Sequence, residues 1–468
     1  MTGFVGRQAE LEILETQYAS PKAEMAIVYG RRRVGKTALI TQFCNGKRTL
    51  FFSARRWTDA VQMRAFSQAV SEFANVRRPI EFEDWMDAFD YLSDLHPEER
   101  LVLVIDEFQY IAQERPSILS ELQNLWDHNL QYKNLMIILC GSAVSFIAKE
   151  VLGQQNPLYG RARTIMKVAP LPLVDAAKIY PQLGAQDQFK IYSVLGGIPY
   201  YYDSMRLDMS LEESIAMNML LDSGFLNQEL QSVMMGEFRD PSTYNGILRA
   251  ISFGATTFNE IAQKSQVPSS RLGFYLGVLQ DMDLVVKEFP VLLHLSEFGN
   301  VQRGIYRLSD NFLRFWFRFV AVKTKPVMTR REAIDIWVED IEPVFSEFAS
   351  QAFEDVCGQY LWRKRFEGAL PMKPARLGRW WHKSVEIDLV GPDAKGENVL
   401  VAECKYRQQK TSISVLKALD KKCEALPIKD SVKVHRYLFS RSGFDDALTE
   451  LAKTDPTLHL VTLEDLFV

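Results

Sequence analysis

The chain has 468 residues, of which 47% are hydrophobic and 24% are charged, and its formal net charge is −4. This length is enough for about three domains, and the slightly acidic balance excludes a chain-wide attraction to nucleic acid. The longest uncharged run, residues 135–148, is too short for a membrane span, and the start of the chain has no secretion signal. Five cysteines show no CxxC pair. We therefore expect a reduced, cytoplasmic protein without structural zinc.

A phosphate-binding loop is the strongest local pattern. Residues 25–29 are an apolar strand, residues 30–37 read GRRRVGKT, and a helix-forming run follows. Glycines at 30 and 35 allow the tight path, Lys36 is expected to reach the β- and γ-phosphates, and the Thr37 hydroxyl is expected to hold Mg²⁺. The alternative, a glycine turn between a strand and a helix, offers no reason for the lysine and threonine. We expect the whole loop to bind nucleotide: Gly30, Arg31, Arg32, Arg33, Val34, Gly35, Lys36, Thr37 and Ala38.

The second half of the predicted nucleotide site is LVLVIDE at residues 101–107. Five apolar residues followed by two acids are typical of a parallel strand that is buried on both faces. Its carboxyl end faces the crevice where open α/β sheets bind ligands. We expect Asp106 to bind Mg²⁺ through water and Glu107 to polarise the attacking water. ATP is therefore the expected ligand, and hydrolysis the expected reaction.

The remaining elements of this predicted core follow in order. Residues 50–53 are a short strand, residues 58–95 have helical periodicity with an apolar stripe at Trp85, Phe89 and Leu92, and residues 116–130 are a further helix. Residues 135–140 form the next strand, which ends in Gly141-Ser142. Ser142 is a candidate γ-phosphate sensor, or else the cap of a following helix.

Two arginines lie in the loop PLYGRAR at residues 157–163. Arg161 could supply an arginine finger to a nucleotide, in cis or from a neighbouring subunit. It could equally pair with a surface carboxylate, as could Arg163.

The middle of the chain is predicted to be largely helical. Residues 173–235 contain a break at GGIPYY, residues 196–201, because glycine and proline both interrupt helices. Three short helical patterns in residues 244–285 and β-rich runs at 284–295 and 304–308 match a helix-turn-helix followed by a wing. The second helix of that motif carries little positive charge beyond Arg271, which favours a packing or relay module over a DNA reader. Residues 326–344 are polar and are expected to form an irregular linker.

A second candidate site lies in the last 120 residues. The strands at 385–390 and 399–406 are expected to pair and to bring Asp388, Glu403 and Lys405 together, while Glu354 leans over them from a helix at 345–356. Two or three carboxylates can hold one or two hard divalent ions, and a lysine can orient or deprotonate the water that attacks a phosphodiester. The alternative is a solvated hairpin with a cross-strand ion pair.

A basic and aromatic segment adjoins this site. Residues 361–384 contain one acid, Glu367, and several basic residues and tryptophans, which suits a nucleic-acid backbone and unpaired bases. They are Arg363, Lys364, Arg365, Lys373, Arg376, Arg379, Lys383, Trp362, Trp380 and Trp381. The alternative is an ordinary solvated face with its tryptophans in the core.

Taken together, these motifs resemble a known family. The segments FVGR, GRRRVGKT, LVLVIDE, CGS, PLYGR, GGIPYYY, FEDV, GRWW, EIDLV and AECKY resemble the prokaryotic archaeal-type AAA ATPases, which are related to signal-transducing STAND NTPases and carry a C-terminal PD-(D/E)xK-like domain. The resemblance covers nearly the whole chain. It implies that Pro199 is a lid proline near the nucleotide, which couples nucleotide state to the downstream domains. The opening FVGR segment resembles the entry segment of AAA-like ATPases, which touches the adenine; by itself it is only a turn and an amphipathic helix. Gly391 stands where a second acid is found in the nuclease pattern, so the metal count is open.

The resemblance and the residues together give a multidomain α/β architecture. We expect a P-loop ATPase core of the ASCE/AAA-like class (residues 1–170), a helical lid (171–238), a winged helix (239–325), the linker (326–344) and a restriction-endonuclease-like α/β domain (345–468). The first functional hypothesis is an ATP-dependent switch, monomeric or homo-oligomeric, that gates a DNA nuclease using Mg²⁺ or Mn²⁺. The second is a regulatory or scaffold ATPase whose C-terminal domain binds nucleic acid or protein without cleaving it. No pore-loop signature supports a protein-remodelling ATPase.

Overall fold

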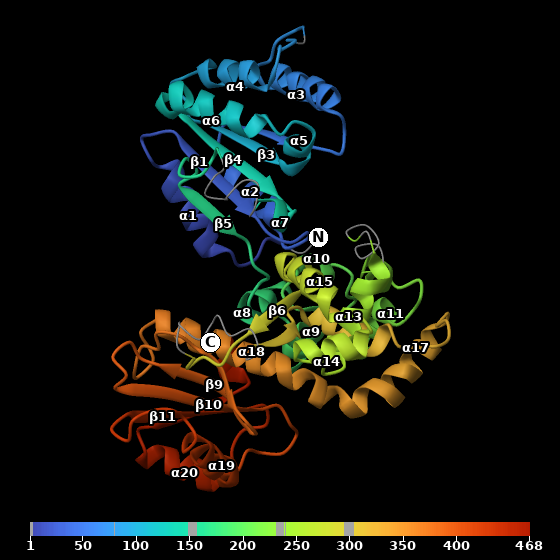
Figure 1. The fold of residues 1–468 in the computed structure, drawn as a ribbon, viewed down its shortest axis with the longest axis vertical. Helices are drawn as coiled ribbons and strands as arrows, with labels where there is room; N and C mark the ends of the chain where they lie inside the picture. Colours follow the sequence, from blue (N-terminus) through green and yellow to red (C-terminus); the bar gives the residue numbers. More distant parts are fainter. Residues whose placement is uncertain (1–2, 79, 148–156, 231–237, 239, 294–303) are drawn as a thin grey trace. The chain divides into compact units, whose positions relative to one another are not determined.

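The computed structural model describes residues 3–78, 80–147, 157–230, 238, 240–293 and 304–468 (Figure 1). It consists of two compact units. The first comprises residues 1–171 and 198–200, and the second comprises residues 172–197 and 201–468. Within the described ranges, no helix combines the length and the apolar character that a membrane crossing requires. Residues 231–237 of the expected lid and 294–295 of an expected strand lie outside the described residues.

A parallel five-stranded sheet forms the centre of the first unit, with the strand order β2-β3-β4-β1-β5. Its strands are β1 (Glu24–Tyr29), β2 (Thr49–Ser53), β3 (Leu101–Asp106), β4 (Leu135–Gly141) and β5 (Thr164–Lys167). Every residue of β3 and β4 is buried, as their uninterrupted apolar sequences predict. The parallel arrangement brings the carboxyl ends of β1, β3 and β4 to one edge, where the phosphate loop begins.

Helices surround this sheet (Figure 1). They are α1 (Gln8–Tyr18), α2 (Lys36–Cys44), α3 (Asp59–Phe73), α4 (Trp85–Asp94), α5 (Gln109–Glu114), α6 (Ile118–His128), the 3₁₀ helix η1 (Leu130–Tyr132) and α7 (Val144–Phe146). The stripe at Trp85, Phe89 and Leu92 is buried in the core, which confirms its prediction. The region predicted to be helical at 58–95 is two helices, because Asp84 accepts the amides of Met86 and Asp87 and starts α4 anew.

The second unit begins with helices on both sides of the GGIP break. They are α8 (Leu173–Ala176), η3 (Ala177–Ile179), α9 (Ala185–Leu195), α10 (Pro199–Tyr202), whose first two residues belong to the first unit, and α11 (Leu211–Met219). Gly196 ends α9 with a φ of 65°, a conformation that favours glycine. The sequence predicted that the helix would be interrupted at this point, and the structure confirms the interruption.

Three helices and a two-stranded antiparallel hairpin follow. They are α13 (Pro241–Ser252), α14 (Phe258–Ser265), α15 (Ser269–Asp281), β6 (Val285–Glu288) and β7 (Ile305–Leu308). A capping box fixes the start of α14, since Thr257 accepts from the amide of Glu260 while Glu260 accepts from the amide of Thr257. After the hairpin come α16 (Asn311–Phe315) and the π-helical turn η6 (Trp316–Val320).

The expectation of an irregular linker at 326–344 is wrong in its local structure. Most of this stretch is helical, with α17 (Arg330–Ile336), η7 (Trp337–Ile341) and η8 (Glu342–Val344). Thr329 and Glu332 form a capping box at the start of α17. Trp337 is buried against Phe315 and Phe345. The polar residues therefore belong to a helical segment that buries one face. Composition alone cannot distinguish such a segment from an irregular linker.

The chain ends in an α/β sheet with the order β12-β11-β10-β9-β8. β9 pairs antiparallel with both β8 and β10, whereas β11 pairs parallel with both β10 and β12. The elements are α18 (Phe345–Phe366), β8 (Gly378–His382), β9 (Val385–Pro392), β10 (Asn398–Lys405), α19 (Ile413–Cys423), β11 (Lys433–Ser440), α20 (Asp446–Thr454), β12 (Leu458–Thr462) and η9 (Glu464–Phe467). A core including Ile387, Leu419 and Leu448 lies between the strands and helices α19 and α20.

Candidate functional site

The phosphate loop joins β1 to α2 and depends on its two glycines. Gly30 has a φ of 153°, and a Cβ at this position would lie 2.5 Å from the carbonyl oxygen of Val168. Gly35 has a φ of 98° and precedes the first turn of α2, which begins at Lys36. No other residue type fits the backbone at Gly30 without displacing Val168, the residue that follows β5. The loop thus ends at a helix N-terminus, where backbone amides favour an anion.

Lys36 and Thr37 are held ready for a nucleotide. The buried Lys36 Nζ donates to the carbonyl oxygens of Gly30 and Arg31, at 2.8 and 3.0 Å. Burial lowers the pKa of Lys36, and the negative charges of Asp106 and Glu107 oppose this effect. Thr37 donates its hydroxyl to Asp106 at 2.9 Å. A lysine on loop carbonyls and a hydroxyl–carboxylate pair at the strand end form a donor set that fits a triphosphate with its Mg²⁺.

Glu107 is oriented by two neighbours, one of them not foreseen. Its carboxylate accepts the hydroxyl of Ser142 at 2.7 Å and the side-chain amide of Gln109. Gln109 also lies 3.3 Å from the Ser142 hydroxyl, so the three side chains form a closed group. Glu107 has a φ of 53°, an uncommon value for a residue other than glycine. Gln109 was missed because nothing in the sequence distinguishes it from an ordinary first-turn helix residue.

Other predicted residues lie around the same loop. Arg7 of the FVGR segment, which is buried, donates to the carbonyl oxygen of Val34 at 2.9 Å. Arg33 lies over the ring of Tyr200, 4.3 Å from its centroid. A Cβ at Gly35 would lie 3.9 Å from Cγ of Pro199. The opening segment and the GGIP proline, which are far apart in the sequence, therefore both reach the phosphate loop.

A role for Arg161 on its own chain's nucleotide is wrong. Arg161 makes a bidentate ion pair with Asp127, at 3.0 and 2.7 Å. It shares a cavity with Lys22 and Ala23, which precede β1, whereas the phosphate loop follows the other end of β1. Six strand residues separate these ends by about 20 Å. The alternative of a surface carboxylate partner holds for Arg161. Arg163 also has a carboxylate partner, but this partner, Glu24 at 3.2 Å, is buried.

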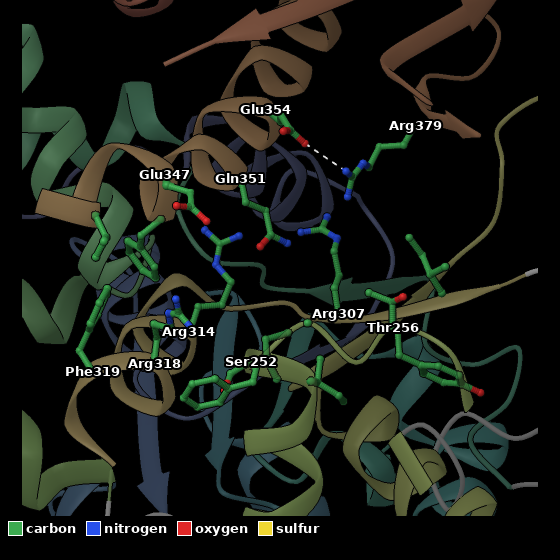
Figure 2. Close-up of a pocket in the computed structure, with 18 residues that line it drawn as sticks. Ser252, Thr256, Arg307, Arg314, Arg318, Phe319, Glu347, Gln351, Glu354 and Arg379 are labelled. Atoms are coloured by element: carbon green, nitrogen blue, oxygen red, sulfur yellow. Dashed lines mark ion pairs between the residues drawn. The ribbon is translucent and has the colours of Figure 1, made fainter. Parts of the chain in front are cut away.

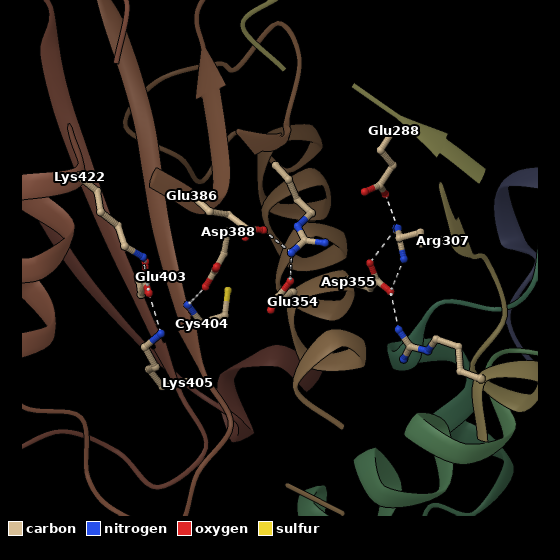
Figure 3. A network of polar contacts seen from close by, with 12 residues as sticks. Glu288, Arg307, Glu354, Asp355, Glu386, Asp388, Glu403, Cys404, Lys405 and Lys422 are labelled. Atoms are coloured by element: carbon tan, nitrogen blue, oxygen red, sulfur yellow. Dashed lines mark hydrogen bonds and ion pairs between the residues drawn. The ribbon is translucent and has the colours of Figure 1, made fainter. Parts of the chain in front are cut away.

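The second predicted cluster lies on α18, β9 and β10 (Figure 3). Asp388 accepts the backbone amide of Cys404 at 2.7 Å. Glu403 is paired with Lys405 at 2.6 Å, and with Lys422 of α19 at 2.8 Å. The structure thus brings Asp388, Glu403 and Lys405 to the same pair of strands. The sequence alone did not foresee Lys422, because the position of α19 against the strands is decided by packing.

Charge repulsion links the carboxylates of this cluster. Burial and then the charge of Asp388 raise the pKa of Glu354 to about 8. Burial and then the charge of Glu403 raise the pKa of Asp388 to about 6. For Lys405, burial acts to lower the pKa, but attraction to Glu403 raises it overall. Three carboxylates that repel one another in a buried place form an electrostatic environment that a divalent cation would relieve.

Cations of the chain already neutralise part of this charge. Arg379 lies 3.5 Å from Glu354 and also pairs with Glu386. In the part of the chain that the structure describes, no three His, Cys, Asp or Glu side chains lie close enough to form a metal-binding group. The donor types suit a hard cation, but Arg379 and the lysines of Glu403 would have to move before all three carboxylates could share one ion.

The basic and aromatic segment at 361–384 is not one continuous strip. Arg363 donates to the carbonyl oxygens of Leu466 and Val468, and Arg365 donates to that of Pro374. Three further members make contacts inside the unit. Arg376 donates to the carbonyl oxygen of Leu293, and Arg379 pairs with Glu354 and Glu386. Trp380 packs in the core. Five of the ten basic and aromatic residues therefore hold the unit together. Trp380 lies in the core, as the alternative interpretation expected, whereas Trp362 and Trp381 are only partly buried.

Comparisons with known proteins agree with this picture in part. Residues 4–204 match the model of an ATPase domain found predominantly in Archaea, and residues 316–416 match a family of archaeal and bacterial proteins of unknown function. An uncharacterized protein of Methanocaldococcus jannaschii is 29% identical over 450 residues, which cover 95% of this chain and 93% of the relative. An uncharacterized ATP-binding protein of the same organism is 53% identical over 45 residues, 10% of this chain and 76% of the relative.

One solved structure gives a useful comparison of folds. The Walker-type ATPase of Pyrococcus abyssi aligns with a TM-score of 0.52 and 20% identity, covering 67% of this chain and 96% of that one. At this identity the similarity concerns the fold alone. The chain therefore combines a parallel-sheet P-loop core with a separate C-terminal α/β domain.

Proposed function

We propose that this chain, which carries an archaeal-type P-loop ATPase domain followed by a C-terminal domain of unknown function, is an ATP-hydrolysing switch coupled to a metal-dependent DNA nuclease-like domain. The observation that supports the ATPase half is the geometry at the carboxyl edge of the sheet. Lys36 and Thr37 lie at the start of α2, and Asp106 and Glu107 lie at the end of β3. Ser142 holds Glu107 in place from β4.

In this proposal each residue has a separate task. Lys36 exchanges its two carbonyl partners for the β- and γ-phosphates, which have far more negative charge. Mg²⁺, when bound through Thr37 and Asp106, neutralises phosphate charge. Glu107 orients the attacking water and accepts its proton. The Ser142 hydroxyl, which donates to Glu107, senses the γ-phosphate in this proposal.

The ATPase half is tested with two substitutions. Lys36→Ala is expected to remove most ATP affinity, because the phosphates lose their only buried ammonium partner in the loop. Glu107→Gln is expected to retain ATP and to lower turnover by on the order of a hundredfold, since a positioned base is lost. ATP binding and phosphate release would be measured on the same preparations. Normal turnover by Glu107→Gln would mean that the base is misassigned.

The nuclease-like half rests on the order of elements and on charge. Helix α18 with Glu354, strand β9 with Asp388 and strand β10 with Glu403 and Lys405 follow the order of a PD-(D/E)xK site. Burial raises the pKa values of Glu354 and Asp388, and the charge of Asp388 adds to the shift of Glu354 while the charge of Glu403 adds to that of Asp388. Mg²⁺ or Mn²⁺ would activate water for attack on a phosphodiester. We also interpret α13–α15 with β6 and β7 as a winged helix that relays nucleotide state.

Cleavage is tested by incubating the full chain with single-stranded, duplex and branched DNA, with and without ATP and Mn²⁺. Lys405→Ala is expected to abolish cutting, because the lysine beside Glu403 is lost. Lys417→Ala, an exposed lysine on α19, is the matched control and is expected to cut normally. Cleavage by Lys405→Ala at the wild-type rate would eliminate the nuclease assignment.

A second candidate function is a scaffold or regulatory ATPase that binds DNA or protein without cutting. It is favoured by one specific observation: Arg379, Lys405 and Lys422 already pair with the carboxylates of the cluster. This function predicts binding that does not need metal. Titration of EDTA into a DNA-binding assay separates the two, because only a metal-dependent site loses affinity.

Two further parts of the proposal concern assembly and location. Arg161 acting on the nucleotide of a neighbouring subunit requires a homo-oligomer. Mixing Arg161→Ala with Lys36→Ala subunits is then expected to recover ATPase activity, and failure to recover it would count against this role. We place the protein in the cytoplasm, in keeping with its five cysteines, all of which carry free thiols.

A further inference from the structure

A cavity of about 460 Å³ lies in the second unit, next to the carboxylate cluster (Figure 2). It is bounded by the end of α13, by β7, by η6 and by the first half of α18. Four arginines line it: Arg307, Arg314, Arg318 and Arg379. This volume falls within the range of small-molecule sites, which is about 300–1,000 Å³.

The four arginines are not equally committed to partners. Arg307 is held by Glu288 and by Asp355, whose oxygens lie 3.0 and 3.1 Å from its guanidinium. Arg379 is held by Glu354 and Glu386. These two arginines have carboxylate partners already and need no ligand for their charge.

Arg314 differs, because it is buried and still has unused donors. It is 6% exposed, and its Nη2 donates to Asn311 at 2.9 Å. Its Nε and Nη1 have no hydrogen-bond acceptor among the described residues, and the nearest carboxylate oxygen, on Asp355, lies 3.9 Å from Nη1. Burial lowers the pKa of Arg314 to about 10. Unpaired donors on a buried cation are costly, so an anion in the cavity would stabilise this arrangement.

Arg318 supplies a second available cation at the rim. Its guanidinium lies 5.1 Å from the centroid of the Phe253 ring, and no ion pair involves it within the described part of the chain. Gln351 faces the same space as Arg314, as Figure 2 shows. The planar donor forks of two arginines match the oxygens of a phosphate group.

The rest of the wall combines the carboxylates of Glu347 and Glu354 and several polar side chains with an apolar and aromatic part. Phe253, Phe319 and Phe348 line the cavity together with Ile251 and Leu308. A free inorganic anion would leave these groups without a partner, whereas an ester with an aromatic body would cover them. We propose that this cavity binds a small phosphate monoester with an aromatic ring, of the size of a nucleoside monophosphate, with its phosphate on Arg314 and Arg318.

The test uses the full chain carrying Lys36→Ala, so that the phosphate loop does not bind nucleotide, and EDTA, so that no metal-bridged binding occurs. AMP, adenosine and inorganic phosphate are titrated by calorimetry. We expect saturable binding of one AMP per chain, at least tenfold weaker binding of phosphate, and no detectable binding of adenosine. Equal affinities for AMP and phosphate would overturn the assignment of an aromatic ester.

Substitutions then locate the site. Adding Arg318→Gln is expected to weaken AMP binding at least tenfold, because a charge-assisted contact is lost at an exposed position that does not support the fold. Arg331→Gln, an exposed arginine of α17 outside the cavity, is the matched control and is expected to leave binding unchanged. No AMP binding to the Lys36→Ala chain, or equal effects of the two substitutions, would overturn the proposal. Neither ATP hydrolysis nor DNA cleavage enters this test.

Discussion

Replacing Ser142 with alanine tests whether the end of β4 positions the catalytic carboxylate. Its hydroxyl donates to Glu107 at 2.7 Å, and a hydrogen bond to a charged group contributes roughly 1.5–3 kcal/mol. At about 1.36 kcal/mol per tenfold change in rate, complete loss of this contribution in the transition state would slow turnover by roughly 10- to 150-fold. Gln109 still donates to Glu107, so we expect the lower end of that range, about tenfold.

The assay is steady-state ATP hydrolysis over a range of ATP concentrations. Ser142→Ala is expected to lower kcat and to leave KM nearly unchanged, because Lys36 and the loop amides still bind the phosphates. Ser142→Thr keeps a hydroxyl and is expected to recover most of the rate. Ser120→Ala, at an exposed serine of α6, is the matched control for a general effect of losing a hydroxyl. A kcat for Ser142→Ala within twofold of the wild-type value would refute the positioning argument.

Three other predictions follow from single contacts. Gly30→Ala is expected to destabilise the first unit by about 1–3 kcal/mol and to weaken ATP binding, since the new Cβ meets the carbonyl oxygen of Val168; unchanged thermal unfolding and ATP affinity would contradict this. Arg161→Gln is expected to cost only about 0.5–1 kcal/mol of stability and to leave ATP affinity unchanged, because its partner is Asp127 of α6, near the end of β1 that is remote from the loop; a large loss of ATP affinity would speak against that placement. The third concerns Glu354, whose folded-state pKa of about 8 lies above its ordinary value of 4.5, so the folded chain retains a proton that the unfolded chain releases, and wild-type stability falls as pH rises from about 5 to beyond 8. Glu354→Gln has no such proton, so in EDTA its stability relative to wild type is expected to rise across that window, by on the order of 2 kcal/mol at pH 9, and denaturant unfolding that gives a pH-independent difference would contradict the reasoning.

Much of the first unit could be predicted from the sequence. The apolar runs that became β3 and β4 are buried along their whole length, and the glycine spacing at residues 30 and 35 matches the loop that the structure contains. These features depend on short stretches of chain: a strand that is buried on both faces needs continuous apolar residues, and a tight loop needs glycine where φ is positive. Such requirements are visible in the residues themselves.

Partners brought from distant parts of the chain were less predictable. Gln109 joins Glu107 and Ser142 only because β3 and β4 are neighbours in the sheet. Lys422 reaches Glu403 because α19 packs against β10. No local pattern encodes these meetings, since each depends on how complete elements pack.

The sequence by itself determined which stretches become the phosphate loop, its acidic partner strand and the carboxylate-bearing strands near the C-terminus, because each has a local signature of burial period or backbone conformation. Only the tertiary structure decided that Arg161 pairs with Asp127, near the end of β1 that is remote from the phosphate loop. It likewise decided that Arg379 pairs with Glu354 and that two lysines pair with Glu403. The physical reason is that a long cationic side chain can reach any carboxylate within several ångströms. Its choice of partner is therefore made by the packing of whole elements, and residue spacing along the chain does not contain that information.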